Sequence, residues 1–257
     1  MKDMYVDIHA HIDFKQFEDL KNHVAQWKKE GMVLIVANGL NKKSNKKVEK
    51  IAKKHDIIRP AYGFHPVDVL EHDNDDINQE IQRIKKSDCV AFGEVGLDYK
   101  YAKTTKQQEK QKKIFQNFIE LSKQTTKPLI IHSRKAERDV IDMLKKAKHK
   151  NAILHCFSGK KKYMQEASDY GLWFSAPSIS DRGQQFKDMT KYVPLTQILT
   201  ETDSPYLSPY EEKHNNPTTV KRTISWLSKI KKESEDTIKK QIIKNAKQVF
   251  NIKIKNS

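Results

Sequence analysis

Histidines and carboxylates of the kind that bind metal ions recur along this sequence at the ends of short apolar runs. Of the ten histidines, five stand at such ends: His9, His11, His65, His132 and His155. Two acidic residues, Glu94 and Asp203, occupy the same position in two further runs. Imidazole nitrogens and carboxylate oxygens are common ligands of divalent cations. The sequence therefore predicts a metal centre if these run ends meet in the folded chain.

The strongest local signal is the His9-Ala10-His11 triplet. Residues two apart on a β-strand share a face, so both imidazoles can approach the same ion. A carboxylate predicted to face a protein interior, as at Glu94 and Asp203, needs a cation or a full set of hydrogen bonds. A lone histidine at a strand end is more often structural, and it is the convergence of six groups that favours metal.

Four imidazoles and two carboxylates exceed the three protein ligands of a typical catalytic zinc. They suit two divalent cations about 3.5–4 Å apart, which activate a water molecule and neutralise charge on a phosphoryl transition state. The metals could be Mg, Mn or Zn. The expected assignment is His9, His11 and Asp203 to one ion, His132 and His155 to the other, and Glu94 to both.

We expect further roles in catalysis or substrate binding for three residues, His65, Arg134 and Asp203. His65 is not needed as a ligand and could contact a phosphate or protonate a leaving oxygen, or simply be a structural residue before a proline. Arg134, two residues beyond His132, could bind a phosphate oxygen or pair at the rim. Asp203 could both ligate a metal ion and hold the attacking water.

Residues near the expected ligands are expected either to support the site through hydrogen bonds or to lie outside it. Asp7 and Glu201 precede ligands by two positions on the same strand face, so we expect them to accept the second N–H of a ligand imidazole. Cys156 should face away from the site, toward the helices. The histidines at positions 23, 55, 72 and 149 are expected at the surface.

The elements that must position these residues alternate between short β-branched runs and longer amphipathic segments. The expected strands are Tyr5–His9, Met32–Ala37, Ile57–Gly63, Val90–Glu94, Leu129–His132, Ala152–His155, Leu172–Ser175 and Ile198–Glu201. Helical periodicity covers Gln107–Gln124, and Asn216-Pro217 reads as the start of another helix. Eight such units in 257 residues predict one α/β domain over residues 1–257, a closed (β/α)8 TIM barrel of parallel strands with outer helices.

Composition limits the partners and the cellular location of the chain. The net charge of +16 suits a polyanion such as nucleic acid. The lysines, however, are spread over most helices and only six of the 49 basic residues are Arg, so a solvated surface is an equal explanation. No apolar run approaches the roughly 18 residues of a membrane helix. With two cysteines and no disulfide spacing, we expect a cytoplasmic monomer that does not bind membranes.

These motifs, taken in order, resemble the TatD family of metal-dependent deoxyribonucleases, within the amidohydrolase-like barrels. The likeness runs from about residue 5 to 250, and the matching stretches are Asp7–His11, Gly63–Pro66, Gly93–Asp98, Ile131–Arg134, His155–Gly159, Glu201–Leu207 and Asn245–Phe250. The resemblance implies 3′–5′ exonuclease activity on DNA, with single-stranded DNA as the expected partner and Mg, Mn or Zn at the site. It implies the same six ligands, with His65 as a catalytic or phosphate-contacting residue.

One stretch departs from the family pattern. Where the family usually reads Arg-Asn-Glu-Pro, this chain has His214-Asn215-Asn216-Pro217. Asn215 is retained and is expected to contact substrate, but the flanking charges are lost.

Other functions remain open on the sequence. Barrels of the superfamily that cleave amides, lactones or phosphotriesters often use a carboxylated lysine where this chain has Glu94, which argues against those groups. A ribonuclease, or a deacylase of aminoacyl-tRNA, would use the same ligands. A non-catalytic nucleic-acid-binding protein is disfavoured, because such a protein would be expected to have lost some of the six ligands.

Overall fold

Eight parallel strands form the centre of the molecule. The computed structural model describes residues 3–211 and 213–254, and its strands are β1 (Tyr5–Ala10), β2 (Met32–Asn38), β3 (Ile58–Ala61), β4 (Phe92–Asp98), β5 (Leu129–Arg134), β6 (Ala152–Leu154), β7 (Trp173–Ala176) and β8 (Ile198–Thr200). Neighbours in sequence pair in parallel within two sheets, β1–β3 and β4–β8. The predicted TIM barrel and its eight strands are confirmed, with strand ends shifted by up to four residues.

Two junctions join the sheets into a closed barrel. Between β3 and β4, the Val90 N–H donates to the Pro60 carbonyl over 2.9 Å, next to a parallel bridge between Ala61 and Ala91. Between β8 and β1, the His11 N–H donates to the Ser204 carbonyl over 2.7 Å. The second junction lies beside the expected metal ligands. Closing the barrel there brings the residues that follow β1 next to those that follow β8.

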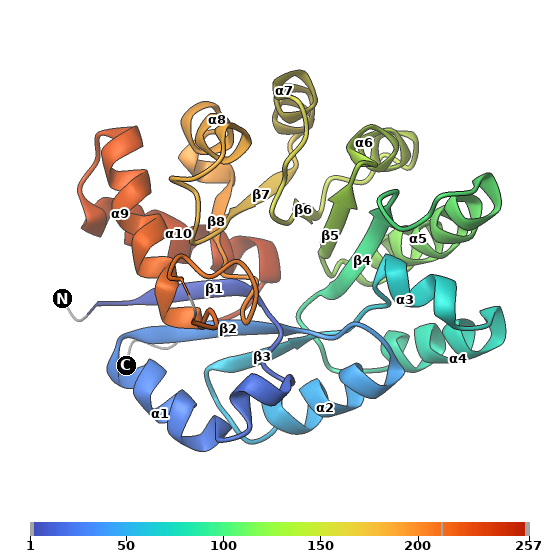
Figure 1. Ribbon diagram of the computed structural model, residues 1–257, viewed down its shortest axis with the longest axis horizontal. Helices are drawn as coiled ribbons and strands as arrows, with labels where there is room; N and C mark the ends of the chain where they lie inside the picture. The colour runs from blue at the N-terminus through green and yellow to red at the C-terminus, as the bar shows by residue number, and fades with distance from the viewer. Residues whose placement is uncertain (1–2, 212, 255–257) are drawn as a thin grey trace.

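Helices surround the strands on the outside of the barrel (Figure 1). They are α1 (Leu20–Lys29), α2 (Lys42–Ala52), α3 (Pro66–Glu71), α4 (Asn74–Lys85), α5 (Thr105–Thr125), α6 (Glu137–Lys146), α7 (Lys161–Tyr170), α8 (Gln184–Tyr192), α9 (Val220–Lys231) and α10 (Glu235–Phe250), with 3-10 turns η1 (Lys15–Phe17), η2 (Leu195–Gln197) and η3 (Pro217–Thr219). The helix expected at Gln107–Gln124 is α5, which begins with a capping box between Thr104 and Gln107. Asn216 caps η3, which leads into α9.

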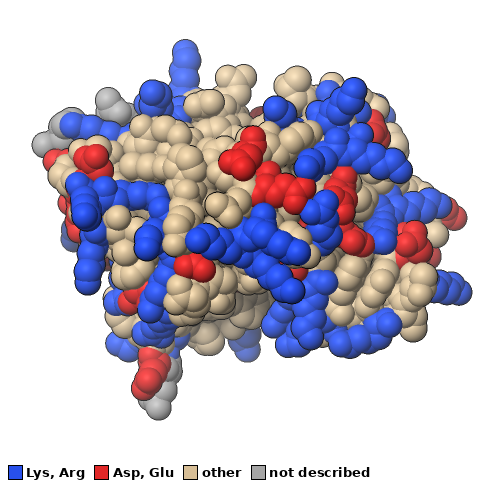
Figure 2. Space-filling model, turned by 90° about the horizontal axis from the view of Figure 1, so that it is seen from above, with Lys and Arg blue, Asp and Glu red and all other residues tan. Residues whose placement is uncertain are grey.

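Two surface properties bear on the sequence expectations. Figure 2 shows Lys and Arg spread over one face with Asp and Glu between them, rather than gathered into one tract. No helix among the residues that the structure describes is long and apolar enough to cross a membrane.

One histidine expected at the surface is instead buried: His149 is 6% exposed, and its Nε2 lies 2.9 Å from the Ser122 hydroxyl.

The main change from the predicted strands concerns β4, which runs four residues beyond Glu94 to Asp98. Gly96 allows this extension, because its φ of 138° is rarely adopted by other residues and a Cβ there would run into the carbonyl oxygen of His132 on β5. Glu94 therefore lies inside a strand, and Asp98, on the same face, reaches the barrel mouth.

We predict that Gly96→Ala lowers the free energy of unfolding by about 2–4 kcal/mol, through backbone strain and overpacking together. Urea unfolding followed by circular dichroism measures it. Gly171→Ala is the matched control, because Gly171 also has a positive φ (98°) but a Cβ there meets only the end of the Lys150 side chain at 3.8 Å. Equal losses in the two variants would refute the close approach at Gly96.

Candidate metal centre

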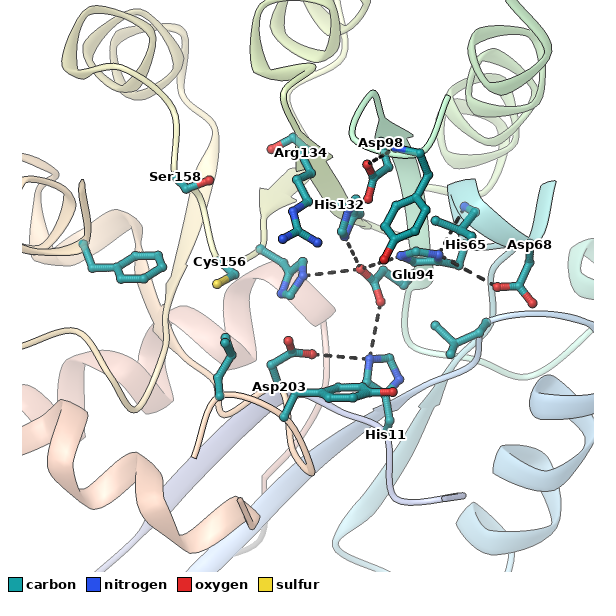
Figure 3. Close-up of a pocket in the computed structure, with 18 residues that line it drawn as sticks. His11, His65, Asp68, Glu94, Asp98, His132, Arg134, Cys156, Ser158 and Asp203 are labelled. Carbon is teal, nitrogen blue, oxygen red and sulfur yellow. Dashed lines mark hydrogen bonds and ion pairs between the residues drawn. The ribbon is translucent and has the colours of Figure 1, made fainter. Parts of the chain in front are cut away.

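A cavity of about 600 Å³ opens at the mouth of the barrel, where the strands end. Figure 3 shows His11, His65, Glu94, His132 and Asp203 converging in it. These residues come from β4 and β5 and from the segments that follow β1, β3 and β8. The carboxyl ends of the barrel strands are where active sites of this fold lie.

The first group of candidate ligands comprises His9, His11, Glu94 and Asp203. The Nε2 atoms of His9 and His11 are 3.2 Å apart. They lie 3.3 and 3.4 Å from Glu94 Oε2, and 3.5 and 3.4 Å from Asp203 Oδ1. Four ligands on a tetrahedron with bonds of about 2.0–2.1 Å are separated by about 3.3–3.4 Å. The spacing therefore fits one divalent cation between them.

The second group surrounds the other oxygen of Glu94. His132 Nδ1 lies 2.8 Å from Glu94 Oε1, and His155 Nε2 lies 3.3 Å from the same atom. Oε2 of Glu94 thus faces His9 and His11, whereas Oε1 faces His132, His155 and, at 3.6 Å, Nε2 of His65. A carboxylate placed in this way can be shared between two cations.

Hydrogen bonds behind the imidazoles fix which nitrogen of each ring faces the cavity. His132 Nε2 is 3.0 Å from Asp98 Oδ2, and His155 Nδ1 is 2.9 Å from Glu201 Oε2. His11 Nδ1 is 3.1 Å from the Asn38 carbonyl. Because a ring N–H is directed to each of these acceptors, the opposite nitrogen presents its lone pair to a metal ion.

Two of these supporting groups were not singled out from the sequence. Asp98 could have been found, because it lies four residues after Glu94 on the same strand face. Asn38 contributes only its backbone carbonyl, which no residue pattern reveals. Glu201 was expected in this role, and the structure shows that the imidazole it supports is that of His155.

Asp7 supports the site in a different way from the one expected. Its buried carboxylate accepts the backbone N–H of His9 and both the N–H and the hydroxyl of Thr202, at 3.0, 3.1 and 2.6 Å. The Nδ1 of His9 has no hydrogen-bond partner among the described residues. Asp7 therefore ties β1 to the segment after β8 instead of holding the His9 ring.

The charges of the cluster favour a bound cation. Burial alone would raise the pKa of Glu94, yet the imidazoles around it, including His155 and the hydrogen-bonded His11, hold it well below its usual range. The pKa of Asp203 is lowered too, against burial, by its contact with His11. Although burial opposes it, the same carboxylates raise the pKa of His11 to about 10. Two buried anions thus draw positive charge to the centre of the site.

His65 lies beside this cluster but is oriented as a hydrogen-bond donor. Its Nδ1 accepts the N–H of Val67 over 3.2 Å, so in the neutral ring the proton is on Nε2. Burial lowers the pKa of His65 to about 3, which keeps the ring neutral. Nε2 lies 3.6 Å from Glu94 Oε1, within the cavity. His65 could complete a ligand set only by giving up its bond to Val67.

Arg134 and Cys156 both line the cavity. The guanidinium of Arg134 makes no hydrogen bond or ion pair within residues 3–211 and 213–254, so it is available to an anion. The position of Cys156 differs from the prediction, which placed it toward the helices. β6 ends at Leu154, and Cys156 has a φ of 45°, so the alternation of a strand no longer applies there.

The substrate contact expected of Asn215 is not supported by the structure. This side chain is 1% exposed and does not line the cavity. Its amide donates to the carbonyls of Thr202 and Leu207 at 2.8 and 3.2 Å, and its oxygen accepts the hydroxyl of Thr219 at 2.6 Å. Asn215 therefore holds the loop after β8 in shape next to Asp203, because every polar atom of its side chain is used inside the protein.

Comparison with known proteins assigns the chain to a family. Its sequence matches the family described as TatD related DNase over residues 6–251. The chain belongs to this family. Together with the ligand set described above, membership makes it a metal-dependent hydrolase of the TatD type.

Relatives of known sequence and structure agree with this placement. A Bacillus subtilis protein named uncharacterized metal-dependent hydrolase YabD is 32% identical, over 97% of this chain and 100% of the relative. Human deoxyribonuclease TATDN3 is 29% identical over 95% of this chain and 94% of its own. The crystal structure of YJJV, a TatD homologue from Escherichia coli, has a TM-score of 0.89 at 24% identity and covers 98% of this chain and 100% of that chain. This last likeness concerns the fold.

We predict that Glu201→Gln weakens divalent-metal binding by about 10–100-fold, because the His155 ring loses its charged acceptor. Equilibrium dialysis with metal analysis measures it. Ser175→Ala is the control, since it removes one hydrogen bond to Glu201 and leaves the contact with His155 in place. Wild-type affinity in a folded Glu201→Gln protein would contradict the role given to this carboxylate.

Proposed function

We propose that this TatD-family hydrolase is a deoxyribonuclease that removes nucleotides from the 3′ end of single-stranded DNA, using two divalent cations. The observation that carries the proposal is the orientation of Glu94, whose two oxygens face two separate groups of histidines. Paired cations of this kind activate water and stabilise both the attacking and the leaving oxygen of a phosphodiester. Mg, Mn and Zn are all compatible with the mixed nitrogen and oxygen ligands.

His9, His11 and Asp203 would hold one cation, His132 and His155 the other, and Glu94 both. Asp203 is also placed to act on the attacking water. Its Oδ2 has no protein partner within the described part of the chain, and its side chain is 18% exposed, so this oxygen can hold the water and accept its proton.

The groups opposite Asp203 suit the phosphate. His65 has its proton on Nε2 and can donate a hydrogen bond to a non-bridging or leaving oxygen of the substrate. Arg134 presents an unpaired guanidinium in the same cavity and can bind a phosphate oxygen through its N–H groups. Together they hold the phosphodiester, and the leaving alkoxide would take up the proton that Asp203 accepts from the attacking water, directly or through solvent.

Cavity size supports an enzyme that works from a strand end. A volume of about 600 Å³ lies in the range of small-molecule sites and is too small for a length of double helix. A terminal nucleotide fits this scale better than the middle of a duplex. Both cysteines are free thiols, which is consistent with an enzyme of the reducing cytoplasm.

The alternatives share the same metal centre and differ in substrate. A ribonuclease or an aminoacyl-tRNA deacylase would use the same water and the same ligands. The decisive experiment is a panel of single-stranded DNA, RNA, aminoacyl-tRNA and small carboxylic esters, with each metal and with chelator. Faster cleavage of DNA supports the proposal, whereas turnover confined to another ester replaces it. Nucleic-acid binding that survives chelator, with no turnover under any condition, indicates a binding protein.

We predict that Glu94→Ala and Asp203→Ala each lower DNA cleavage by more than about 10³-fold, because the charge-stabilising centre is lost. Activity on a labelled single strand is measured with added Mg2+ or Mn2+, and circular dichroism checks folding. Asp169→Ala, which removes an exposed carboxylate on α7, is the control. Both site variants cleaving at the wild-type rate would show that the site has been misassigned.

We also predict that His65→Ala lowers the turnover number by about 10²–10⁴-fold while metal occupancy stays near the wild-type value. The reason is that Nε2 serves the substrate and not a cation. Turnover and bound metal are measured on the same preparation. If metal and activity fall together, His65 is a ligand.

A further inference from the structure

Four large side chains that carry apolar surface are exposed among the described residues, and all four are tyrosines: Tyr101, Tyr192, Tyr206 and Tyr210. Two of these, Tyr101 at 51% and Tyr206 at 53% exposure, line the cavity of the metal centre. Neither has a hydroxyl hydrogen bond within residues 3–211 and 213–254. By contrast, Tyr99, next to this region, donates its hydroxyl to Asp139 over 2.6 Å. The rings of the two cavity tyrosines are thus exposed to solvent, and within the described residues their hydroxyls hold no part of the structure together.

Barrel topology places these two rings on opposite sides of the mouth. Tyr101 follows β4, and Tyr206 follows β8. In a closed ring of eight strands joined in sequence order, β4 and β8 are four positions apart and face each other across the barrel axis. The cations would lie between them, near Glu94.

Each tyrosine is also attached to the metal centre through its own backbone. The Tyr101 N–H donates to Oδ1 of Asp98, whose other oxygen contacts His132. The Tyr206 N–H donates to the Asp203 carbonyl over 2.8 Å. The ring of Tyr206 is braced edge-to-face by Phe14, with centroids 5.8 Å apart. These contacts fix the backbone of both tyrosines and the ring of Tyr206 before any substrate arrives.

We propose that Tyr101 and Tyr206 stack on unpaired nucleobases flanking the scissile phosphate, and so select a single-stranded end. The inference rests on the proposed function at this same site. Aromatic side chains beside a cationic groove bind single strands through the faces of successive bases, whatever the sequence. Bases inside a duplex are already stacked on one another and cannot offer these faces. The remaining cavity wall supplies Leu40, Val67, Phe186 and Leu207, which suit bases better than phosphates.

Binding to a fluorescent single-stranded oligothymidylate, measured by anisotropy in EDTA and low salt, tests the stacking apart from catalysis. We expect Tyr101→Ala and Tyr206→Ala each to bind about 5- to 100-fold more weakly than wild type. Tyr206→Phe keeps the ring and should bind like wild type. Tyr192→Ala, on α8 and 43% exposed but outside the cavity, is the matched control and should also bind like wild type.

An abasic oligonucleotide of the same length separates stacking from a general loss of affinity. Wild type should bind it more weakly than oligothymidylate, and the alanine variants should show little further loss. Equal losses on both oligonucleotides, or a Tyr206→Phe variant as weak as Tyr206→Ala, would overturn the inference. Failure of the proposed function is a different result: metal-loaded enzyme that cleaves no DNA, whatever the binding data show.

Discussion

A single buried carboxylate sets the main constraint on this molecule. Glu94 is 3% exposed, yet histidines carried at the ends of β1, β5 and β6 point at its two oxygens. A negative charge in that position is tolerable only if positive charge meets it from several directions. β1, β5 and β6 must therefore end at the same height as Glu94 on β4. The closed barrel satisfies this requirement because all its parallel strands end on one rim.

The rest of the site serves to keep that arrangement rigid. Asp98 and Glu201 orient the imidazoles of the second group, and Asp7 ties the end of β1 to the segment after β8 that carries Asp203. Asp203 itself adopts a φ of 57°, a left-handed conformation that residues other than glycine seldom hold without support from their surroundings. The neighbouring Asn215 uses its whole side chain to brace the loop in which Asp203 lies. Residues that never touch substrate thus set the precision of those that do.

The barrel and the candidate ligands could be predicted from the sequence, because both depend on residues that recur at regular spacings. Apolar runs of strand length recur eight times, and His9 and His11 fall two apart, as ligands on one strand face must. Predictions based on alternation fail where a strand has already ended, as at Cys156. Partnerships over long distances are equally hidden: nothing local indicates that Glu201 supports His155, or that Asn215 points inward. One barrel fold supports many unrelated reactions, so the fold alone does not fix the reaction.

The junction between β1 and β8 also determines when the site can come into existence. Asp7 and Thr202, which are hydrogen-bonded across this junction, are 195 residues apart in the chain. His9 and His11 leave the ribosome early, whereas Asp203 is among the last elements of the barrel to be made. A nascent chain therefore cannot assemble the first cation site until nearly the whole barrel has been synthesised. The enzyme is therefore inactive while it is being translated, because its metal centre is incomplete.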